Sequence, residues 1–171
     1  MPDDRWMPRL KSKISQERAF VRFLNRSTRI VDVFWINFRG QRVNYVRNTA
    51  GLCPGQYFEV NTFAGHPWIF RDRETNDKLQ CGSQGQEVYF PVGWNGEFPP
   101  SRTNVLIDVP VYSLVERSMQ IIRKIVCKKD IEDLEIPKPL KHQLLHPDDL
   151  PVWYPDENPE CVLAEEDNDQ G

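Results

Sequence analysis

The sequence predicts a mostly β protein with a small α domain, in which a β-sandwich is followed by a short helical cluster. Between residues 19 and 109, short apolar runs alternate with groups of Gly, Pro and Asn, a pattern typical of many short strands in a sandwich or barrel. One strongly amphipathic segment follows at residues 111–126. The chain has 171 residues, 39% of them hydrophobic and 27% charged, which suffices for one globular core and a smaller unit.

The expected strands cover six apolar runs between turn-forming residues: 19–24, 30–38, 56–63, 68–71, 87–91 and 104–109. They place the sandwich domain at residues 19–110. The polar residues 1–18 are expected to form a poorly ordered arm. Residues 151–171 are acidic and contain no lysine or arginine, so we expect a disordered tail.

The turn at residues 64–67 (Ala-Gly-His-Pro) joins two of these strands and carries a histidine. Thr62 lies just before it and Trp68 directly after it, while Trp35 and Tyr45 lie on neighbouring segments. An imidazole, a hydroxyl and aromatic rings together favour a pocket with an apolar floor and a polar rim. The same rings also fit an ordinary sandwich core, and these residues alone do not separate the two interpretations.

Residues 111–126 form the only strong helix pattern in the chain. Ser113 and Glu116 have capping-box spacing, and Pro110 lies just outside the start. At ~100° per residue, the apolar side chains cover an arc of about 160°, whereas a helix on one core needs only ~100°. We therefore expect this face to contact both its own domain and a partner. The alternative is a helix buried on all sides within its own protein, but the chain that follows the helix is too short to cover it.

Four separate segments of the chain match segments of a known family and occur in the same order as in that family. They are Phe-Leu-Asn-Arg-Ser at 23–27, Trp-Ile-Asn-Phe at 35–38, Gly-His-Pro-Trp-Ile-Phe-Arg-Asp at 65–72 and Pro-Val-Tyr-Ser-Leu-Val-Glu-Arg at 110–117. On these segments the chain resembles the von Hippel–Lindau tumour suppressor family, the substrate receptor of a cullin-RING ubiquitin ligase. The resemblance implies a β-sandwich that binds a hydroxylated proline. It also implies a small helical domain that binds Elongin C and a cullin.

The resemblance implies seven residues that bind the hydroxyproline peptide: Trp35, Tyr45, Asn61, Thr62, Phe63, His66 and Trp68. Thr62 and His66 correspond to the groups that hydrogen-bond the ligand hydroxyl, so plain proline would leave both without a partner, at ~1–3 kcal/mol per group. Asn61 stands where the family usually has a second histidine, and Phe63 replaces a tyrosine. These departures affect contacts with the flanking peptide more than the pocket itself.

The resemblance further implies two docking sites in an α domain at residues 111–150. Elongin C would contact Leu114, Arg117, Ser118, Met119, Ile121 and Ile122. Ser118 stands where the family has a cysteine, and its hydroxyl is expected to bond back to the Leu114 carbonyl. A cullin would contact Ile136, Pro137, Leu140 and Leu144. Without the first site beside it, the second pattern fits an ordinary Pro-started amphipathic helix equally well.

These implications lead to a non-catalytic adaptor that needs no cofactor. It would bind the hydroxylated α subunit of a hypoxia-inducible transcription factor and target it for degradation with Elongin C, Elongin B, a cullin and a RING protein, in the cytoplasm and nucleus. The alternative, suggested by Ser118, is a hydroxyproline-peptide-binding scaffold without ligase assembly. A small hydrolase is a third interpretation, but no Gly-x-Ser-x-Gly, His-Glu-x-x-His or phosphate-loop motif supports it.

Composition and spacing argue against other classes of function. No apolar run approaches the ~20 residues of a membrane span, and the first residues lack the apolar stretch of a secretory signal. Neither the acidic tail nor the scattered basic residues resemble a nucleic-acid footprint. His142 and His146 lack a third ligand, so no metal site is expected. Wide spacing favours free thiols in a reducing compartment for Cys53, Cys81, Cys127 and Cys161.

Overall fold

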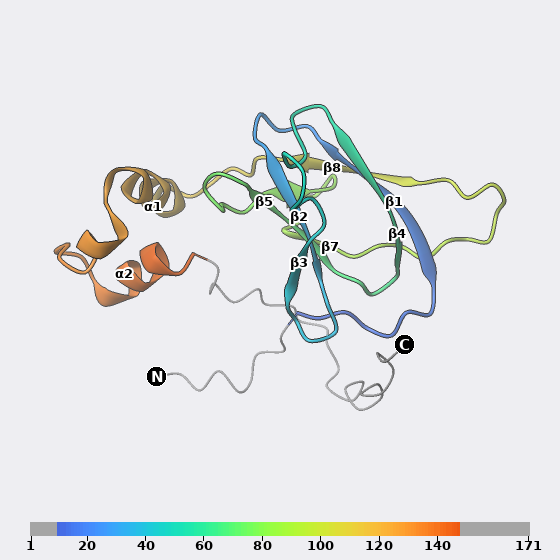
Figure 1. Cartoon of the computed structure of the whole chain (residues 1–171), viewed down its shortest axis with the longest axis horizontal. Helices are drawn as coiled ribbons and strands as arrows, with labels where there is room; N and C mark the ends of the chain where they lie inside the picture. Colours follow the sequence, from blue (N-terminus) through green and yellow to red (C-terminus); the bar gives the residue numbers. More distant parts are fainter. Residues whose placement is uncertain (1–9, 148–171) are drawn as a thin grey trace.

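The computed structural model describes residues 10–147, with the sandwich and the helical unit at opposite ends of the molecule (Figure 1). The strands are β1 (Arg18–Asn25), β2 (Val31–Ile36), β3 (Arg42–Asn44), β4 (Tyr57–Phe63), β5 (Trp68–Asp72), β6 (Gln80–Cys81), β7 (Val88–Tyr89) and β8 (Thr103–Asp108). The helices are α1 (Leu114–Ile125), the 3-10 helix η2 (Lys128–Asp130) and α2 (Lys138–Leu145). The predicted fold class is therefore confirmed. The expected tail and residues 1–9 of the expected arm lie outside the described residues.

Two four-stranded sheets, with strand orders β4-β1-β8-β6 and β3-β2-β5-β7, enclose the main core. In β1 buried residues alternate with more exposed ones, as expected for a strand with one face on a core. Phe23 lies on the buried side and is fully enclosed. Its ring centroid is 5.3 Å from that of Trp68 and 5.0 Å from that of Phe70 in the opposite sheet. Aromatic rings thus join the two sheets.

Sequence reasoning misses the short strands β3 and β6. β3 has three residues and β6 has two, and runs this short have no visible hydrophobic period. Each forms because a longer strand beside it offers backbone partners. Trp35 in β2 pairs with Val43 in β3, and Ile107 in β8 pairs with Cys81 in β6.

The expected strand at residues 30–38 ends early because the chain turns at Asn37. The Asn37 Oδ1 atom accepts hydrogen bonds of 2.9 Å from the backbone N–H groups of Arg39 and Gln41. Asparagine favours turns for this reason, because its side chain bonds to backbone groups shortly after it. The chain then returns antiparallel to β2 as β3.

Residues 10–17 differ from the expected poorly ordered arm, because they lie against the sandwich although they form no helix or strand. Ser12 is buried, and its backbone N–H donates to the Asn37 carbonyl over 3.1 Å. Further along, the Ala64 N–H donates to the Glu17 carbonyl over 2.8 Å. Backbone hydrogen bonds hold the segment, so no hydrophobic pattern in the sequence predicts its position.

The helix expected at residues 111–126 is observed as α1, with the expected capping box. The Ser113 hydroxyl accepts from the Glu116 N–H, and the Glu116 carboxylate accepts from the Ser113 N–H. The helical unit has its own apolar cluster, made by Met119, Ile122, Val126, Ile131, Leu134, Ile136, Leu140, Leu144 and Leu145. No helix in the described part of the chain combines the length and apolar character required to cross a membrane.

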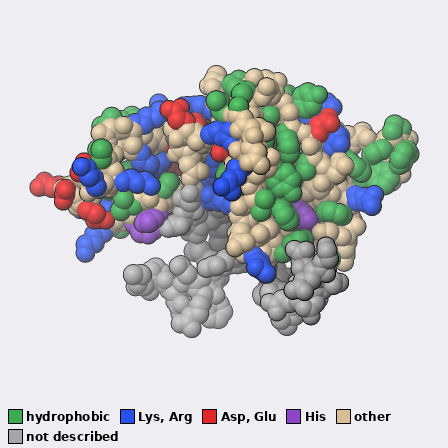
Figure 2. Space-filling view, viewed as in Figure 1, with side chains coloured by type: hydrophobic (Ala, Val, Ile, Leu, Met, Phe, Trp, Pro, Cys, Tyr) green, Lys and Arg blue, Asp and Glu red, His purple; other side chains and the backbone are tan. Residues whose placement is uncertain are grey.

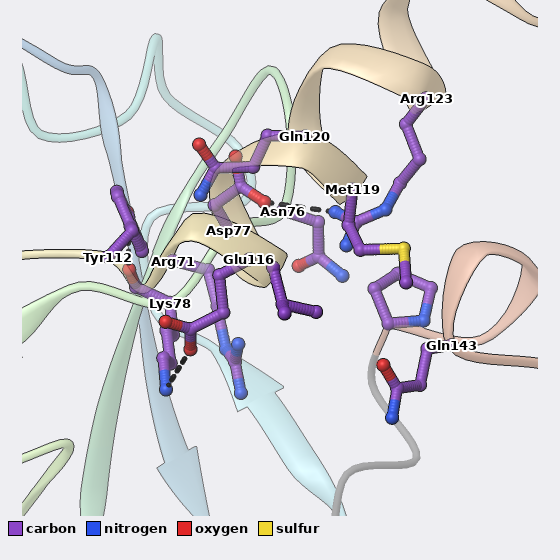
Figure 3. Close-up of a pocket in the computed structure, with 12 residues that line it drawn as sticks. Arg71, Asn76, Asp77, Lys78, Tyr112, Glu116, Met119, Gln120, Arg123 and Gln143 are labelled. Carbon is purple, nitrogen blue, oxygen red and sulfur yellow. Dashed lines mark hydrogen bonds and ion pairs between the residues drawn. The ribbon is translucent and has the colours of Figure 1, made fainter. Parts of the chain in front are cut away.

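A cleft between α1 and the sandwich is bridged by two ion pairs (Figure 3). Lys78 Nζ lies 2.6 Å from Glu116 Oε1, and Arg123 Nη1 lies 3.0 Å from Asp77 Oδ1. The Tyr112 hydroxyl donates to the Lys78 carbonyl over 2.7 Å. Burial raises the pKa of Tyr112 to about 12, so this donor persists at neutral pH. Since the two units have separate apolar clusters, polar contacts contribute strongly to how they fit together.

Replacing Arg123 by alanine should loosen α1 from the sandwich. The Asp77 carboxylate has little exposure and would lose its guanidinium partner, at about 1–2 kcal/mol for a partly buried charged hydrogen bond. Amide hydrogen exchange should therefore quicken in α1 while β1 and β5 keep their protection. Lys124→Ala, at the exposed neighbouring position, is the control and should change neither region. Equal exchange rates in both variants would show that the ion pair does not hold the junction.

Candidate functional site: an aromatic pocket and an exposed helix stripe

Five of the seven predicted peptide-binding residues come together where the two sheets meet: Trp35, Tyr45, Thr62, His66 and Trp68. The turn after β4 crosses from one sheet to the other, and β5 then pairs with β2 so that Trp68 lies opposite Trp35. Tyr45 directly follows β3, which flanks β2 on its other side. Figure 2 shows hydrophobic side chains gathered on this part of the sandwich, between β3 and β4.

Three of these rings pack against one another, and we call this cluster, together with Thr62 and His66, the aromatic pocket after the ligand site predicted here. The Tyr45 ring meets the Trp68 ring edge-on, with 4.9 Å between centroids, and lies 6.4 Å from the Trp35 ring. Trp68 is only 1% exposed and belongs to the main core, whereas Tyr45 is 44% exposed. Trp68 therefore belongs to the sandwich core, as the second interpretation expects, whereas Tyr45 is accessible from solvent.

Thr62 places its hydroxyl beside the floor of this pocket. The side chain points inward from β4 and is 5% exposed. Its Oγ1 atom accepts a hydrogen bond of 3.3 Å from the Trp68 indole N–H. A hydroxyl carries one donor and two acceptor lone pairs, so Thr62 retains a donor and a lone pair for a ligand.

His66 is held between aromatic rings at the edge of the pocket. It is 6% exposed and stacks on Trp35, with 5.4 Å between ring centroids and 24° between planes. Phe38 and Phe63 pack against it at 5.4 and 5.3 Å. Burial lowers the pKa of His66, although a hydrogen bond with the Lys13 backbone opposes this shift. The imidazole is therefore neutral at pH 7, with one donor and one acceptor nitrogen.

The other two predicted contacts, Asn61 and Phe63, flank Thr62 on β4 and so point away from the sandwich core. Asn61 is exposed, and its Oδ1 atom accepts a 3.0 Å hydrogen bond from Arg102. Phe63 is half-buried and reaches the pocket only through His66. The structure thus brings Phe63 to the rim, but it directs Asn61 toward Arg102.

Sequence reasoning misses two serines that contact the pocket from residues 10–17. The Trp35 indole N–H donates to Ser12 Oγ over 2.7 Å, and Ser12 Oγ donates in turn to the Ile36 carbonyl. Ser15 Oγ lies 3.0 Å from His66 Nε2. Each serine is remote in sequence from its partner, and a serine in a polar segment gives no signal that would identify it.

The six residues predicted to contact Elongin C divide between two faces of α1. Leu114, Arg117, Ser118 and Ile121 are exposed, whereas Met119 is buried and Ile122 half-buried in the helical unit's own cluster. Leu114 is 84% and Ile125 is 75% exposed. We call the exposed residues at helical spacing the α1 stripe: Leu114, Ser118, Ile121 and Ile125. The wide apolar arc thus has one inward face and one free face.

Ser118 lies in the middle of the α1 stripe. Its hydroxyl donates to the Leu114 carbonyl over 2.8 Å, so the predicted back-bond is confirmed. This bond satisfies the only donor of the hydroxyl and leaves its lone pairs facing outward.

The predicted cullin contacts mostly build the helical unit. Leu144 is fully buried, and Ile136 and Leu140 are half-buried in the same cluster. Pro137 is exposed at the start of α2. The spacing of these residues is therefore accounted for by internal packing, as the ordinary amphipathic-helix interpretation expects. Only Pro137 is largely accessible to a partner.

The cysteines and histidines of the described residues show no metal-binding arrangement. Cys53, Cys81 and Cys127 are free thiols. Burial raises the pKa of Cys81 to about 12, so this thiol stays protonated and unreactive at neutral pH. Within residues 10–147, no group of three His, Cys, Asp or Glu side chains could hold a metal ion.

Comparison with known proteins gives two matches. Residues 10–96 match the family model described as the VHL beta domain. Protein Vhl of Drosophila melanogaster is 30% identical over 139 residues, which covers 74% of this chain and 76% of that relative. The matched region includes the aromatic pocket and the segment that carries Ser12 and Ser15.

Proposed function

This chain belongs to the von Hippel–Lindau (VHL) family, and from this premise we propose that it is a non-catalytic substrate receptor of an Elongin–cullin ubiquitin ligase. The receptor binds a degron that contains hydroxyproline, most specifically that of a hypoxia-inducible transcription factor α subunit. The observation that carries this proposal is the aromatic pocket, in which two nearly buried polar groups, Thr62 and His66, lie beside the rings of Trp35 and Trp68.

This pocket has the chemistry to distinguish hydroxyproline from proline. Aromatic walls accept the pyrrolidine ring with or without its hydroxyl. A hydroxyl on that ring can pair with the Thr62 oxygen and the imidazole of His66, which are otherwise sealed from water when a ligand enters. Proline leaves these groups unpaired, and sites of this kind reject the ligand that lacks the hydroxyl by factors on the order of 10³ or more.

The position of β4 supports an extended peptide as the ligand. β4 is the outermost strand of its sheet, so its free edge can pair with an added strand. Backbone hydrogen bonds along that edge would supply affinity that does not depend on peptide sequence. The pocket at the end of the same strand would then supply the selectivity for hydroxyproline.

The α1 stripe supports the ligase half of the proposal. Leu114, Ile121 and Ile125 expose apolar surface at helical spacing although the helical unit already has its own cluster. An amphipathic helix that leaves a second apolar face free is suited to dock in a partner's groove. Elongin C, with Elongin B, is the proposed occupant, and a cullin with its RING protein completes the assembly. The free thiols of the described cysteines are compatible with the proposed cytoplasmic and nuclear location.

Two binding measurements test the proposal together. An immobilised hydroxyproline peptide from a hypoxia-inducible factor α subunit should retain the protein, whereas the matching proline peptide should not. Co-expressed Elongin C and Elongin B should co-purify with it. Peptide binding without Elongin C would favour the scaffold alternative that Ser118 suggests, and equal retention on both peptides would contradict hydroxyproline recognition.

Replacing Ser118 by cysteine should tighten Elongin C binding about threefold. The outward lone pairs of the serine oxygen lose water when the helix docks, whereas a thiol behaves as a small hydrophobe. The gain is modest because the hydroxyl proton is already paired with the Leu114 carbonyl. Titration calorimetry gives the dissociation constants, with Ser118→Leu as the opposite case, since a larger side chain crowds the contact. Three equal constants would mean that Ser118 does not face the partner.

A further inference from the structure

The backbone hydrogen bonds between β1 and β4 determine which groups of β4 face its free edge. At one end of the pairing the Asn25 N–H donates to the Gln56 carbonyl over 2.9 Å, and at the other end the Ala64 N–H donates to the Glu17 carbonyl over 2.8 Å. Antiparallel strands alternate between pairs of residues that exchange hydrogen bonds and pairs that do not. Because the register is continuous between these two bonds, the even-numbered residues of β4 bond to β1, and the odd-numbered residues direct their N–H and C=O groups to the free edge.

This alternation suits a proline ring at the pocket. Thr62 is even-numbered, so a residue that lies opposite it in an added antiparallel strand exchanges no hydrogen bond with it. Proline has no N–H, and sheets accept it only where that donor is not required. Residues opposite each other in antiparallel strands share one face of the sheet, with Cβ atoms ~4.5–5.5 Å apart. Hydroxyproline opposite Thr62 would therefore direct its ring into the aromatic pocket, and this position sets the register of the whole peptide.

Tyr57 lies at the other end of β4, on the outward face of the sheet. Its side chain is 60% exposed, and the Arg22 guanidinium lies 4.8 Å from the centroid of its ring, within the range of a cation–π contact. Arg22 is itself held by hydrogen bonds of 2.8 and 2.5 Å to the Glu59 carboxylate. This ion pair fixes the guanidinium beside the ring and offsets its charge. Tyr57 is thus an oriented aromatic surface next to the free edge.

We propose that Tyr57, held by Arg22, is a second subsite for the degron, which takes a large apolar or aromatic side chain at the fifth residue after the hydroxyproline. This inference rests on the proposed function, because the pocket sets the register. In an added antiparallel strand, the more stable pairing per residue, successive peptide residues lie opposite decreasing numbers of β4. The fifth residue after the one opposite Thr62 therefore lies opposite Tyr57. An odd number of steps also turns its side chain to the outward face, where the Tyr57 ring lies.

The test compares hydroxyproline peptides that differ only at this fifth residue, which is Phe, Ala or Asp. In calorimetric titrations of the full chain, the Phe peptide should have a dissociation constant about twofold to fivefold lower than the Ala peptide, as expected for one cross-strand aromatic pair. Tyr57→Ala should make these two constants equal, whereas Tyr57→Phe keeps the ring and should retain the preference. Phe98→Ala is the matched control, because Phe98 is also a highly exposed aromatic residue but lies in the loop before β8. It should leave the preference unchanged.

Titrations with the matching plain proline peptides separate this inference from the proposed function. The preference for hydroxyproline depends on the pocket, so Tyr57→Ala, on the other face of the sheet, should leave it unchanged. A wild type that does not distinguish hydroxyproline from proline would contradict the proposed function. A wild type that does, yet binds the Phe and Ala peptides equally or the Asp peptide most tightly, would overturn the Tyr57 subsite alone. A preference for Phe that persists in Tyr57→Ala would overturn it as well.

Discussion

Thr62→Val and His66→Ala should each reduce the preference for the hydroxylated peptide by one to two powers of ten. Each change removes a polar partner of the ligand hydroxyl within a nearly buried site, and a buried group left unpaired costs ~1–3 kcal/mol, at ~1.4 kcal/mol per decade. Affinity for the proline peptide should not fall, because the rings of Tyr45 and Trp68 still hold the pyrrolidine and one polar group that proline leaves unpaired has been removed. Calorimetric titration of both peptides against each variant gives the ratio.

The Thr62→Val variant needs a control, because the wild-type Thr62 hydroxyl also accepts a hydrogen bond from the Trp68 indole N–H. Thr62→Val leaves that buried donor unpaired, so we expect a loss of stability of ~1 kcal/mol in addition to the loss of selectivity. Thr62→Ser keeps the hydroxyl and should retain both properties. Thermal unfolding separates the two effects. If folded Thr62→Val and His66→Ala proteins still distinguish the peptides as well as the wild type, the hydroxyl is recognised elsewhere.

Leu114→Asp should abolish the complex with Elongin C while peptide binding by the sandwich persists. Leu114 is the most exposed apolar residue of the α1 stripe, and a docked carboxylate in its place would lose its water without a partner. The helix itself should tolerate the change. Residue 114 is the first of α1, where the helix dipole favours a negative charge. Loss of binding would therefore report the contact rather than unfolding.

Gel filtration with purified Elongin C and Elongin B measures this outcome. Val92→Asp is a matched control, since Val92 is also a highly exposed apolar residue but lies in a loop of the sandwich. That variant should co-migrate with Elongin C as the wild type does. Co-migration of Leu114→Asp would show that the partner uses another surface, and failure of both variants would indicate a non-specific effect of the added charge.

The sequence predicts those parts of the fold whose own residues carry a repeating pattern. β1 alternates over eight residues, and α1 combines a capping box with a helical period over twelve, so local chemistry specifies both elements. β3 and β6 depend on the backbone of a neighbouring strand, and no short-range signal encodes that dependence. The width of the apolar arc on α1 predicts that two faces exist. It does not identify which of Met119 and Leu114 turns inward.

The candidate site shows the same division. Thr62, His66 and Trp68 flank one turn, and the turn chemistry of residues 64–67 predicts that they lie close together. Ser12 and Ser15 could not be predicted, because hydrogen bonds bring them to partners more than twenty residues away. For Asn61 the sequence predicts a peptide contact but not its surroundings: the outward register of β4 places it beside the Arg102 guanidinium.

The parallel pairing of β1 with β8 has a consequence for how the chain acquires its structure during synthesis. Val21 in β1 pairs with Thr103 in β8. β1 therefore cannot complete its pairing until a strand about eighty residues further along the chain has been synthesised. Contacts between such distant residues slow folding, since a long loop must close before they form. The ribosome therefore releases most of the sandwich before its first sheet can be completed. Because α1 begins soon after β8, the ligand pocket and the helical unit should mature almost together, after most of the sandwich has been synthesised.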